Sequence, residues 1–279
     1  MIKTPLRYLR QSCRGIQGPV LRRFESSCSG PVISPKVGAD QKTLQVLYPS
    51  GRVTYEQAAE IQDRYVRKAL DSKAAGLSTP PPTLLCFEMD PVYTIGRRER
   101  GKLSETEREH LNHNGAHLVE TLRGGQTTFH GPGQLVAYPI VDLRALHLPV
   151  RCYVRILENS IINTLGKYGI SSKITDNTGV WINDDEKIAA IGIHVRRSVT
   201  SHGMALNVST DTAWFDRIIA CGLPDKSTTT MAKQGVETSI HEVAQVFSAQ
   251  LASALDCNKV EELPISRDGI DQGHSPNSQ

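Results

Sequence analysis

The sequence contains a cysteine and a lysine that together could perform nucleophilic chemistry. Cys221 follows the apolar segment Ile218–Ala220, and Lys187 opens the apolar run Ile188–Ile193. Each has an ordinary explanation, because buried cysteines often serve as small apolar residues and lysines at strand ends often lie in solvent. A thiol beside an ammonium group, however, has a lowered pKa and is more often ionised. The pair therefore predicts a thiolate that attacks an acyl thioester.

The same two groups define a transfer reaction that needs no cofactor. Attack of Cys221 on a thioester exchanges one thioester for another, and the amine of a substrate lysine can then take the acyl group as a stable amide. Lys187, once neutral, could accept the proton that this amine loses. Because the donor is already activated, the reaction requires no ATP.

Three histidines leave a second mechanism open. His130 and His202 lie in glycine-flanked segments and His194 lies in a strand-like pattern. His202 could therefore act as the base of a cysteine–histidine pair. A metal site built from His194, His202 and Cys221 would match no common ligand spacing, and the six cysteines include no CxxC pair. The sequence therefore predicts no metal.

The segment Arg123–Gln134 (RGGQTTFHGPGQ) is the densest group of glycine and polar residues in the chain. Glycines let the backbone approach a ligand closely, and the polar side chains would surround that approach. A tight turn between two strands would explain some of the glycines but not the polar residues between them. The segment has neither the Gly-Lys-Ser/Thr of a phosphate loop nor a GxGxxG before a helix. We predict a binding loop for another kind of ligand.

Helical and strand-like patterns are interleaved, but several strands are adjacent in sequence. Capping pairs and apolar spacing predict helices after Thr54, Ser104 and Ser239, and over 150–168 and 212–218. The predicted strands cover 83–89, 92–95, 117–121, 134–140, 179–182, 187–195 and 203–209. This mixture predicts an α/β (α+β) fold in which a mixed sheet is flanked by helices.

The first 24 residues carry six basic side chains and no acid. This composition, with apolar residues interspersed, is typical of a mitochondrial transit peptide. The basic residues are Lys3, Arg7, Arg10, Arg14, Arg22 and Arg23. Removing them changes the net charge from +3 to about −3, so the overall charge does not indicate a nucleic-acid partner.

These patterns divide the chain into three parts. We expect a transit peptide and linker over 1–43, a catalytic domain over 44–260 and a disordered polar tail over 261–279. A membrane span is not expected, because no run of about 18 apolar residues occurs.

Four motifs resemble the mitochondrial and bacterial lipoyl(octanoyl) transferases and occur in that family's order. They are RGGQTTFHGPGQ at 123–134, GVWI at 179–182 with KIAAIG at 187–192, SHGMALNV at 201–208, and CGL at 221–223. The resemblance covers about 45–255. It implies a biotin/lipoate protein ligase-like catalytic domain. It also implies transfer of an octanoyl group from octanoyl-acyl carrier protein to a lysine of a lipoyl domain, the first step of protein lipoylation.

The resemblance assigns roles to individual residues. Cys221 would carry the acyl thioester, and Lys187 would activate it. Substrate-binding positions would be Arg123, Gly124, Gly125, Gln126, Thr127, Thr128, Phe129, His130, Ala190, Ile191, Gly192, Gly203, Met204 and Ala205. Two positions depart from the family pattern: Ala220 stands where proline is usual, and Phe129 replaces a frequent tyrosine. Neither change removes the thiol.

The resemblance also implies partners and a location. The acceptors would be lipoyl domains of 2-oxoacid dehydrogenase E2 subunits and the glycine cleavage H protein. The enzyme would be a monomer in the mitochondrial matrix, with no nucleic-acid or membrane partner and no cofactor. Three alternatives remain: an ATP-dependent lipoate–protein ligase of the same fold, a lipoyl amidotransferase, and a non-catalytic acyl- or lipoyl-domain-binding module. ATP dependence, the donor and turnover would separate them.

Overall fold

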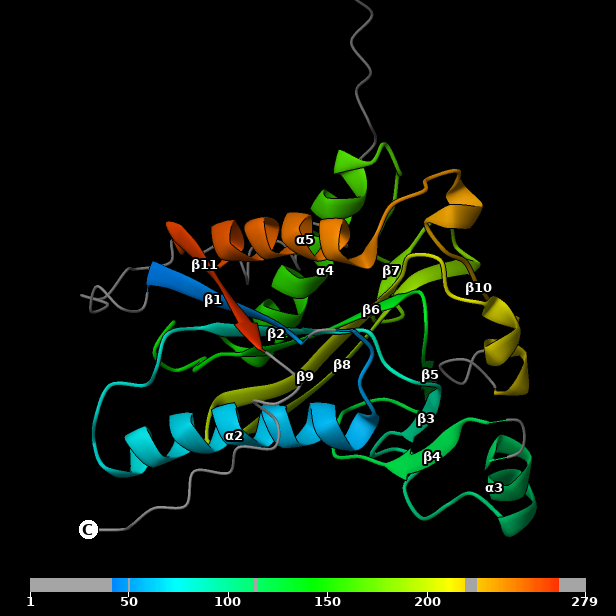
Figure 1. The fold of residues 1–279 in the computed structure, drawn as a ribbon, viewed down its shortest axis with the longest axis horizontal. Helices are drawn as coiled ribbons and strands as arrows, with labels where there is room; N and C mark the ends of the chain where they lie inside the picture. The colour runs from blue at the N-terminus through cyan, green and yellow to red at the C-terminus, as the bar shows by residue number, and fades with distance from the viewer. Residues whose placement is uncertain (1–41, 50, 113–114, 219–224, 266–279) are drawn as a thin grey trace, which may run out of the picture. The chain divides into compact units, whose positions relative to one another are not determined.

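A mixed sheet with helices on both faces forms the core of the computed structural model, which describes residues 42–49, 51–112, 115–218 and 225–265 (Figure 1). The sheet has eight strands in the order β10-β8-β9-β6-β2-β1-β11, and β7 pairs with β8. The strands are β1 Thr43–Pro49, β2 Thr83–Phe87, β6 Gln134–Ile140, β7 Val180–Trp181, β8 Glu186–Arg196, β9 Val199–Asn207, β10 Ser227–Thr228 and β11 Lys259–Ile265. β1 pairs in parallel with β2 and β11, as β10 does with β8, and the other pairs are antiparallel. The predicted fold class is confirmed.

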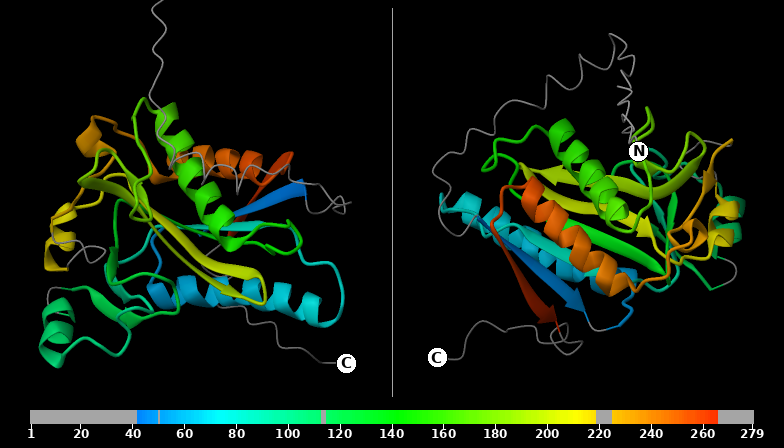
Figure 2. Two further views of the ribbon diagram at one scale, coloured as in Figure 1. Left: turned by 180° about the vertical axis from the view of Figure 1, so that it is seen from behind. Right: turned by 90° about the horizontal axis from the view of Figure 1, so that it is seen from above.

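Three long helices cover the sheet. α2 lies on one face, and α4 and α5 lie together on the other (Figures 1 and 2). Their bounds are α2 Tyr55–Ala74, α4 Val150–Lys167 and α5 Ile240–Ala254. Leu157 of α4 and Phe247 of α5 share one buried core with Leu206, whereas Ile61 of α2 packs in a second core with Phe87. The sheet therefore separates two apolar layers, which is the arrangement that stabilises such domains.

The helix starts follow from local hydrogen bonding. The Thr54 hydroxyl accepts from the Gln57 backbone N–H at 3.3 Å, and the Gln57 side chain accepts from the Thr54 N–H at 2.9 Å. Ser239 and Glu242 form the same reciprocal pair at α5. Each pair satisfies two backbone donors that the first helical turn leaves unpaired. Ser104 and Glu107 form the third predicted pair, with the Ser104 N–H donating to the Glu107 carboxylate at 2.8 Å and the Glu107 N–H donating to the Ser104 hydroxyl at 3.3 Å, so all three predicted capping pairs are confirmed.

A smaller sheet lies beside the large one. It has the order β4-β3-β5. Its strands are β3 Val92–Ile95, β4 His117–Glu120 and β5 Thr128–His130. The helix α3 Glu105–Asn112 contacts β4, and the 3₁₀ helix η2 Thr212–Arg217 contacts β5. A second 3₁₀ helix, η4, spans Ala232–Gln234. β5 lies within the glycine-rich segment and pairs antiparallel with β3, and the segment ends at Gln134, the first residue of β6. The pairing of β5 with β3 fixes this part of the predicted binding loop to the scaffold.

The structure adds strands that the apolar patterns did not predict. β1, β5, β10 and β11 are new, and β9 begins at Val199 instead of 203. β11 continues to Ile265, past the expected domain end at residue 260, and pairs with β1 along its whole length. Its sequence, KVEELPI, carries charges and a proline, which is typical of an edge strand and hides the apolar signal. None of the described helices has the length and apolar content needed to cross a bilayer.

Candidate functional site

A cavity of ≈ 370 Å³ lies where the glycine-rich segment meets β8 and β9. It is lined by Lys187 and by every predicted substrate-binding residue except Phe129. Residues that the sequence did not single out for binding also line it, namely Arg98, Tyr138, Val154, Asp176, Asn177, Thr178 and Ile193, together with His202. The fold therefore brings the three predicted binding segments to one cavity.

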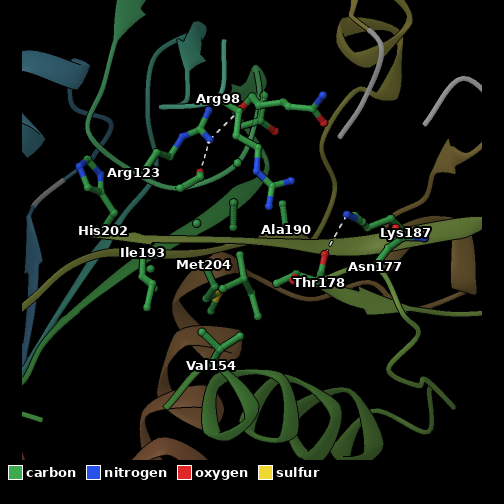
Figure 3. A pocket seen from close by; sticks show the side chains of 18 of the residues that line it. Arg98, Arg123, Val154, Asn177, Thr178, Lys187, Ala190, Ile193, His202 and Met204 are labelled. Atoms are coloured by element: carbon green, nitrogen blue, oxygen red, sulfur yellow. Dashed lines mark hydrogen bonds between the residues drawn. The ribbon is translucent and has the colours of Figure 1, made fainter. Parts of the chain in front are cut away.

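The cavity has a polar side and an apolar side. Figure 3 shows Arg123 and His202 on one side of the strands, and Ile193, Met204 and Val154 on the other. Val154 reaches the cavity from α4. An apolar chain that carries a polar reacting group matches such a lining.

Arg123 organises the glycine-rich segment from within. Its side chain is buried, and one guanidinium nitrogen donates to the carbonyls of Gly124 at 3.0 Å and Gln126 at 2.8 Å. Its Nε donates to the Thr94 hydroxyl of β3 at 3.1 Å. Opposite these contacts, the Glu99 carboxylate accepts from the Thr127 N–H at 2.7 Å. The loop is therefore pre-formed, and the positive charge of Arg123 is used to hold it in place.

The loop packs directly on β8 because a glycine lies beneath it. The Gly124 N–H donates to the Ile193 carbonyl at 2.9 Å. A Cβ placed on Gly192 would lie 2.9 Å from the Gly124 carbonyl oxygen and 3.3 Å from Cδ of Arg123. A side chain at this position would push the loop off the strand, so the glycine in KIAAIG is needed for the shape of the cavity.

Phe129 does not line the cavity, although the sequence resemblance placed it among the substrate-binding residues. It is fully buried, stacks on Trp214 with 4.9 Å between ring centroids, and lies 5.4 Å from the ring of Tyr93. The alternation of side chains along β5 explains this position, because neighbouring Thr128 and His130 reach the cavity while Phe129 points the other way. In the structure its role is to anchor the loop.

Lys187 is buried at the cavity with its ammonium group held on two sides. Nζ donates to the Thr178 carbonyl at 3.0 Å and lies 4.5 Å from the centroid of the Trp181 ring. Thr228 of β10 lies opposite Lys187 in the sheet. Cys221 falls outside the described residues, so its distance from Lys187 stays a prediction.

The other thiols that can be described are poor nucleophiles. Cys86 and Cys257 are buried. Burial, reinforced by the nearby Glu262, raises the pKa of Cys86, and burial together with Asp256 raises the pKa of Cys257 to about 11. Both thiols are therefore protonated at neutral pH, as is usual for structural cysteines.

His130 belongs to a hydrogen-bond chain that ends on a backbone carbonyl. Asn207 Nδ2 donates to the Thr229 carbonyl at 3.1 Å, and Gln134 Nε2 donates to Asn207 Oδ1 at 2.8 Å. Gln134 Oε1 then faces His130 Nδ1 at 2.8 Å. Since a carbonyl can only accept, the chain places the proton of a neutral His130 on Nδ1. Burial and the charge of Arg123 lower the pKa of His130 to about 4.

His202 has an unusual backbone conformation. Its φ is +54°, which is uncommon for a residue that is not glycine, and its backbone N–H donates to the buried Gln62 side chain of α2. It lies opposite Ile193 in the β8–β9 register but points to the other side of the strands (Figure 3). Burial, and then the charge of Arg123, lower its pKa to about 3. Such an imidazole is a weak base, which disfavours His202 as the group that ionises a thiol.

The described residues contain no group of three or more histidine, cysteine, aspartate or glutamate side chains that could hold a metal ion.

Comparisons with known proteins agree with this geometry. Residues 54–252 match the family model of the lipoyl protein ligase A/B catalytic domain. The chain is 44% identical over 207 residues to the octanoyltransferase of Solibacter usitatus, covering 74% of this chain and 90% of that protein. It is 42% identical over 213 residues to the Danio rerio octanoyl-acyl-carrier-protein:protein N-octanoyltransferase LIPT2, mitochondrial, covering 75% and 92%.

Solved structures show the same fold at low sequence identity. A lipoate-protein ligase A bound with ATP superposes with a TM-score of 0.58 at 15% identity, covering 84% of this chain and 95% of that chain. A bi-partite lipoate protein ligase from Thermoplasma acidophilum gives a TM-score of 0.60 at 15% identity, covering 83% and 93%.

Proposed function

Because the chain belongs to the lipoyl protein ligase A/B catalytic-domain family and, within it, to the octanoyltransferases, we propose that it transfers an octanoyl group from acyl carrier protein to a lysine of lipoyl domains through Cys221. The observation that carries this proposal is the cavity in which the glycine-rich loop, the small residues of β8 and β9, and the buried ammonium of Lys187 meet. The cavity can enclose an apolar acyl chain, and the Lys187 ammonium can provide a positive charge near the thioester.

The reaction proceeds in two half-reactions. In the first, the Cys221 thiolate attacks the octanoyl thioester, the bond between the acyl carbon and the carrier sulfur breaks, and the carrier leaves as a thiol after taking a proton from the Lys187 ammonium, which becomes neutral. In the second, a lysine amine of the lipoyl domain attacks the new thioester and releases the Cys221 sulfur. Lys187 in its neutral form takes the proton of that amine, and its ammonium form returns to stabilise the thiolate.

The experiment that tests this function is an ATP-free assay with octanoyl-acyl carrier protein and a purified lipoyl domain. The acceptor should gain one octanoyl group, and the enzyme incubated with donor alone should gain the same mass. A requirement for ATP with free octanoate or lipoate would instead identify an ATP-dependent ligase. Transfer from an already lipoylated protein, and not from the carrier, would identify an amidotransferase.

One exposed arginine of the cavity wall and two exposed arginines near His194 indicate how the donor binds. Arg98 lines the cavity and donates its backbone N–H to the Gly125 carbonyl at 3.2 Å. Arg97 and Arg196 are close enough to His194 that their charges, after burial, lower the pKa of that histidine. Within the described ranges, none of the three arginines pairs with an acid. Exposed positive charge without an acidic partner attracts an anionic protein.

Arg98→Ala is therefore expected to raise KM for the acyl carrier about threefold to tenfold while kcat changes little, because a rim charge acts mainly on encounter. The effect should shrink as salt is added, since screening weakens the attraction in the wild type as well. Arg144→Ala, an exposed arginine in the loop before α4, is the control. An equal change in KM for both variants would contradict a local role of Arg98.

We also propose that residues 1–43 direct the protein to the mitochondrial matrix. The catalytic domain follows this segment, and the enzyme acts as a monomer. The composition of the first 24 residues and the mitochondrial name of the Danio rerio relative support the location. A fluorescent fusion of the full chain should enter the matrix, and the same fusion lacking residues 1–43 should not. Retention of matrix import by the shortened fusion would refute the targeting role.

A further inference from the structure

We propose that Glu158 is a positioning residue for Lys187. The Glu158 carboxylate holds the turn Asn177–Gly179 in place, and the Thr178 carbonyl of that turn accepts a hydrogen bond from the Lys187 ammonium. This inference rests on the proposed role of Lys187 in activating Cys221. Glu158 itself touches neither the substrate nor the thiol, and it acts through the turn.

The carboxylate lies in the protein interior between a helix and the turn. Glu158 belongs to α4 and its side chain is 5% exposed. One carboxylate oxygen, Oε1, accepts from the Gly179 backbone N–H at 3.2 Å, and Oε2 lies 3.2 Å from a guanidinium nitrogen of Arg155. Val154, one helical turn earlier, lines the cavity. One face of α4 thus contributes both a cavity wall and a support for the neighbouring turn.

Gly179 brings the turn into direct contact with Lys187. Its φ is +125°, and a Cβ at this position would lie 2.6 Å from the Ala189 carbonyl oxygen and 3.3 Å from Cε of Lys187. Only glycine fits this backbone conformation and this space. The backbone of the turn therefore packs against the lysine stem, and a shift of the turn would move the carbonyl that accepts from Nζ at 3.0 Å.

A second contact holds the other end of the turn. Trp181 Nε1 donates to the Asn177 carbonyl at 2.9 Å, and the same ring lies against the Lys187 ammonium. Glu158 and Trp181 thus fix the two ends of the turn, with Thr178 between them. Asp176, Asn177 and Thr178 also line the cavity, so the turn forms part of the wall beside the proposed reaction centre.

Burying the Glu158 carboxylate would be unfavourable without specific partners for its charge. Burial raises the pKa of Glu158, whereas the Gly179 N–H, then Arg155 and then Lys187 lower it. A carboxylate in this environment must be satisfied by specific partners, and its partners are a backbone donor of the turn, Arg155 and the charge of Lys187. We attribute the effect on Lys187 to the hydrogen bond to Gly179, which sets the position of the turn, and not to the negative charge.

Two matched variants separate position from charge. Glu158→Gln keeps the length and the acceptor oxygen but removes the charge, and should retain kcat within about threefold of the wild type. Glu158→Asp keeps the charge but is one methylene too short to reach Gly179, and should lower kcat roughly tenfold to a hundredfold. The pH profile for alkylation of Cys221, measured by mass spectrometry, should move to higher pH in Glu158→Asp but not in Glu158→Gln.

A background lacking the lysine provides a further readout. In Lys187→Met, the substitution Glu158→Asp should cause no further shift of the alkylation profile, because there is no ammonium left to position. A merely structural role would lower stability equally in both backgrounds and would leave the profile unmoved. If Glu158→Asp does not fold, Glu158→Ala, which removes both the acceptor and the buried charge, makes the same comparison.

The inference is overturned if Glu158→Gln is impaired like Glu158→Asp, or if folded Glu158→Asp behaves like the wild type. Either result leaves the proposed function intact as long as the wild type forms an octanoyl adduct on Cys221 and Lys187→Met shifts the alkylation profile. If the wild type forms no such adduct, the proposed function itself fails, and that outcome is visible before any Glu158 variant is made.

Discussion

Cys221→Ala is expected to lower octanoyl transfer to the lipoyl domain by at least ~10³-fold, because no acyl-enzyme can form without the thiol. The mass increase that is expected when the wild-type enzyme is incubated with donor alone should be absent in this variant. Binding of the carrier should persist, since the glycine-rich loop and Arg98 are unchanged. Intact-mass spectrometry and a lipoyl-domain acylation assay measure the two effects separately.

Two control variants make this result specific. Cys221→Ser replaces sulfur by a poorer nucleophile, so any adduct should form slowly and resist hydroxylamine, unlike a thioester. Cys257→Ala removes a buried thiol whose raised pKa leaves it protonated, so it should form the normal adduct. A hydroxylamine-labile adduct on Cys221→Ala would show that another residue carries the acyl group.

Lys187→Met is expected to move the alkylation profile of Cys221 to higher pH by about one to three pH units, the shift that a neighbouring opposite charge causes. At pH 7 the fraction of thiolate, and with it the alkylation rate, should fall about 10- to 30-fold, because a thiol with the ordinary pKa of ~8.5 is still about 3% ionised there. At alkaline pH, where both thiols are ionised, the two profiles should converge. Methionine keeps most of the apolar stem, so packing against Trp181 is largely preserved.

The matched control for this variant is Lys173→Met. Lys173 forms an exposed ion pair with Asp184, with 2.7 Å between Nζ and the carboxylate, and it lies shortly before the turn at Asn177. Its removal should leave the alkylation profile in place. Identical profiles for Lys187→Met and the wild type would remove the basis for an activated thiol, even if transfer still depended on Cys221.

Features with a local physical cause could be predicted from the sequence. The Thr54–Gln57 and Ser239–Glu242 pairs mark helix starts because capping depends on residues three positions apart. The glycine-rich segment could be singled out because its polar and glycine residues are contiguous, and most of these residues line the cavity. Lys187 was predicted together with that loop and does line the same cavity.

Features that depend on tertiary packing could not be predicted in this way. Glu158 lies on an ordinary helical pattern, and its contact with Gly179 exists only because α4 packs beside β7 and β8. The positive φ of His202 occurs together with a hydrogen bond from its backbone N–H to Gln62, which belongs to a helix distant in sequence. Phe129 lies next to two cavity residues but points into the aromatic cluster around Trp214, and motif membership alone cannot give that direction. The turn at 176–179 has a local signal, Asp-Asn-Thr-Gly, which is typical of a turn but does not indicate its contact with Lys187.

The parallel pairing of β1 with β11 has a consequence for how the chain matures. These strands lie at opposite ends of the described sequence, yet Thr43 faces Lys259 and Pro49 faces Ile265. In the mitochondrial import proposed above, the chain would thread through a translocation pore amino end first, which would deliver β1 early and β11 among its last segments. Until then β1 has an open hydrogen-bonding edge, which is prone to pair with the wrong neighbour. A general chaperone at the exit of the pore would have to shield that edge until the closing strand arrives.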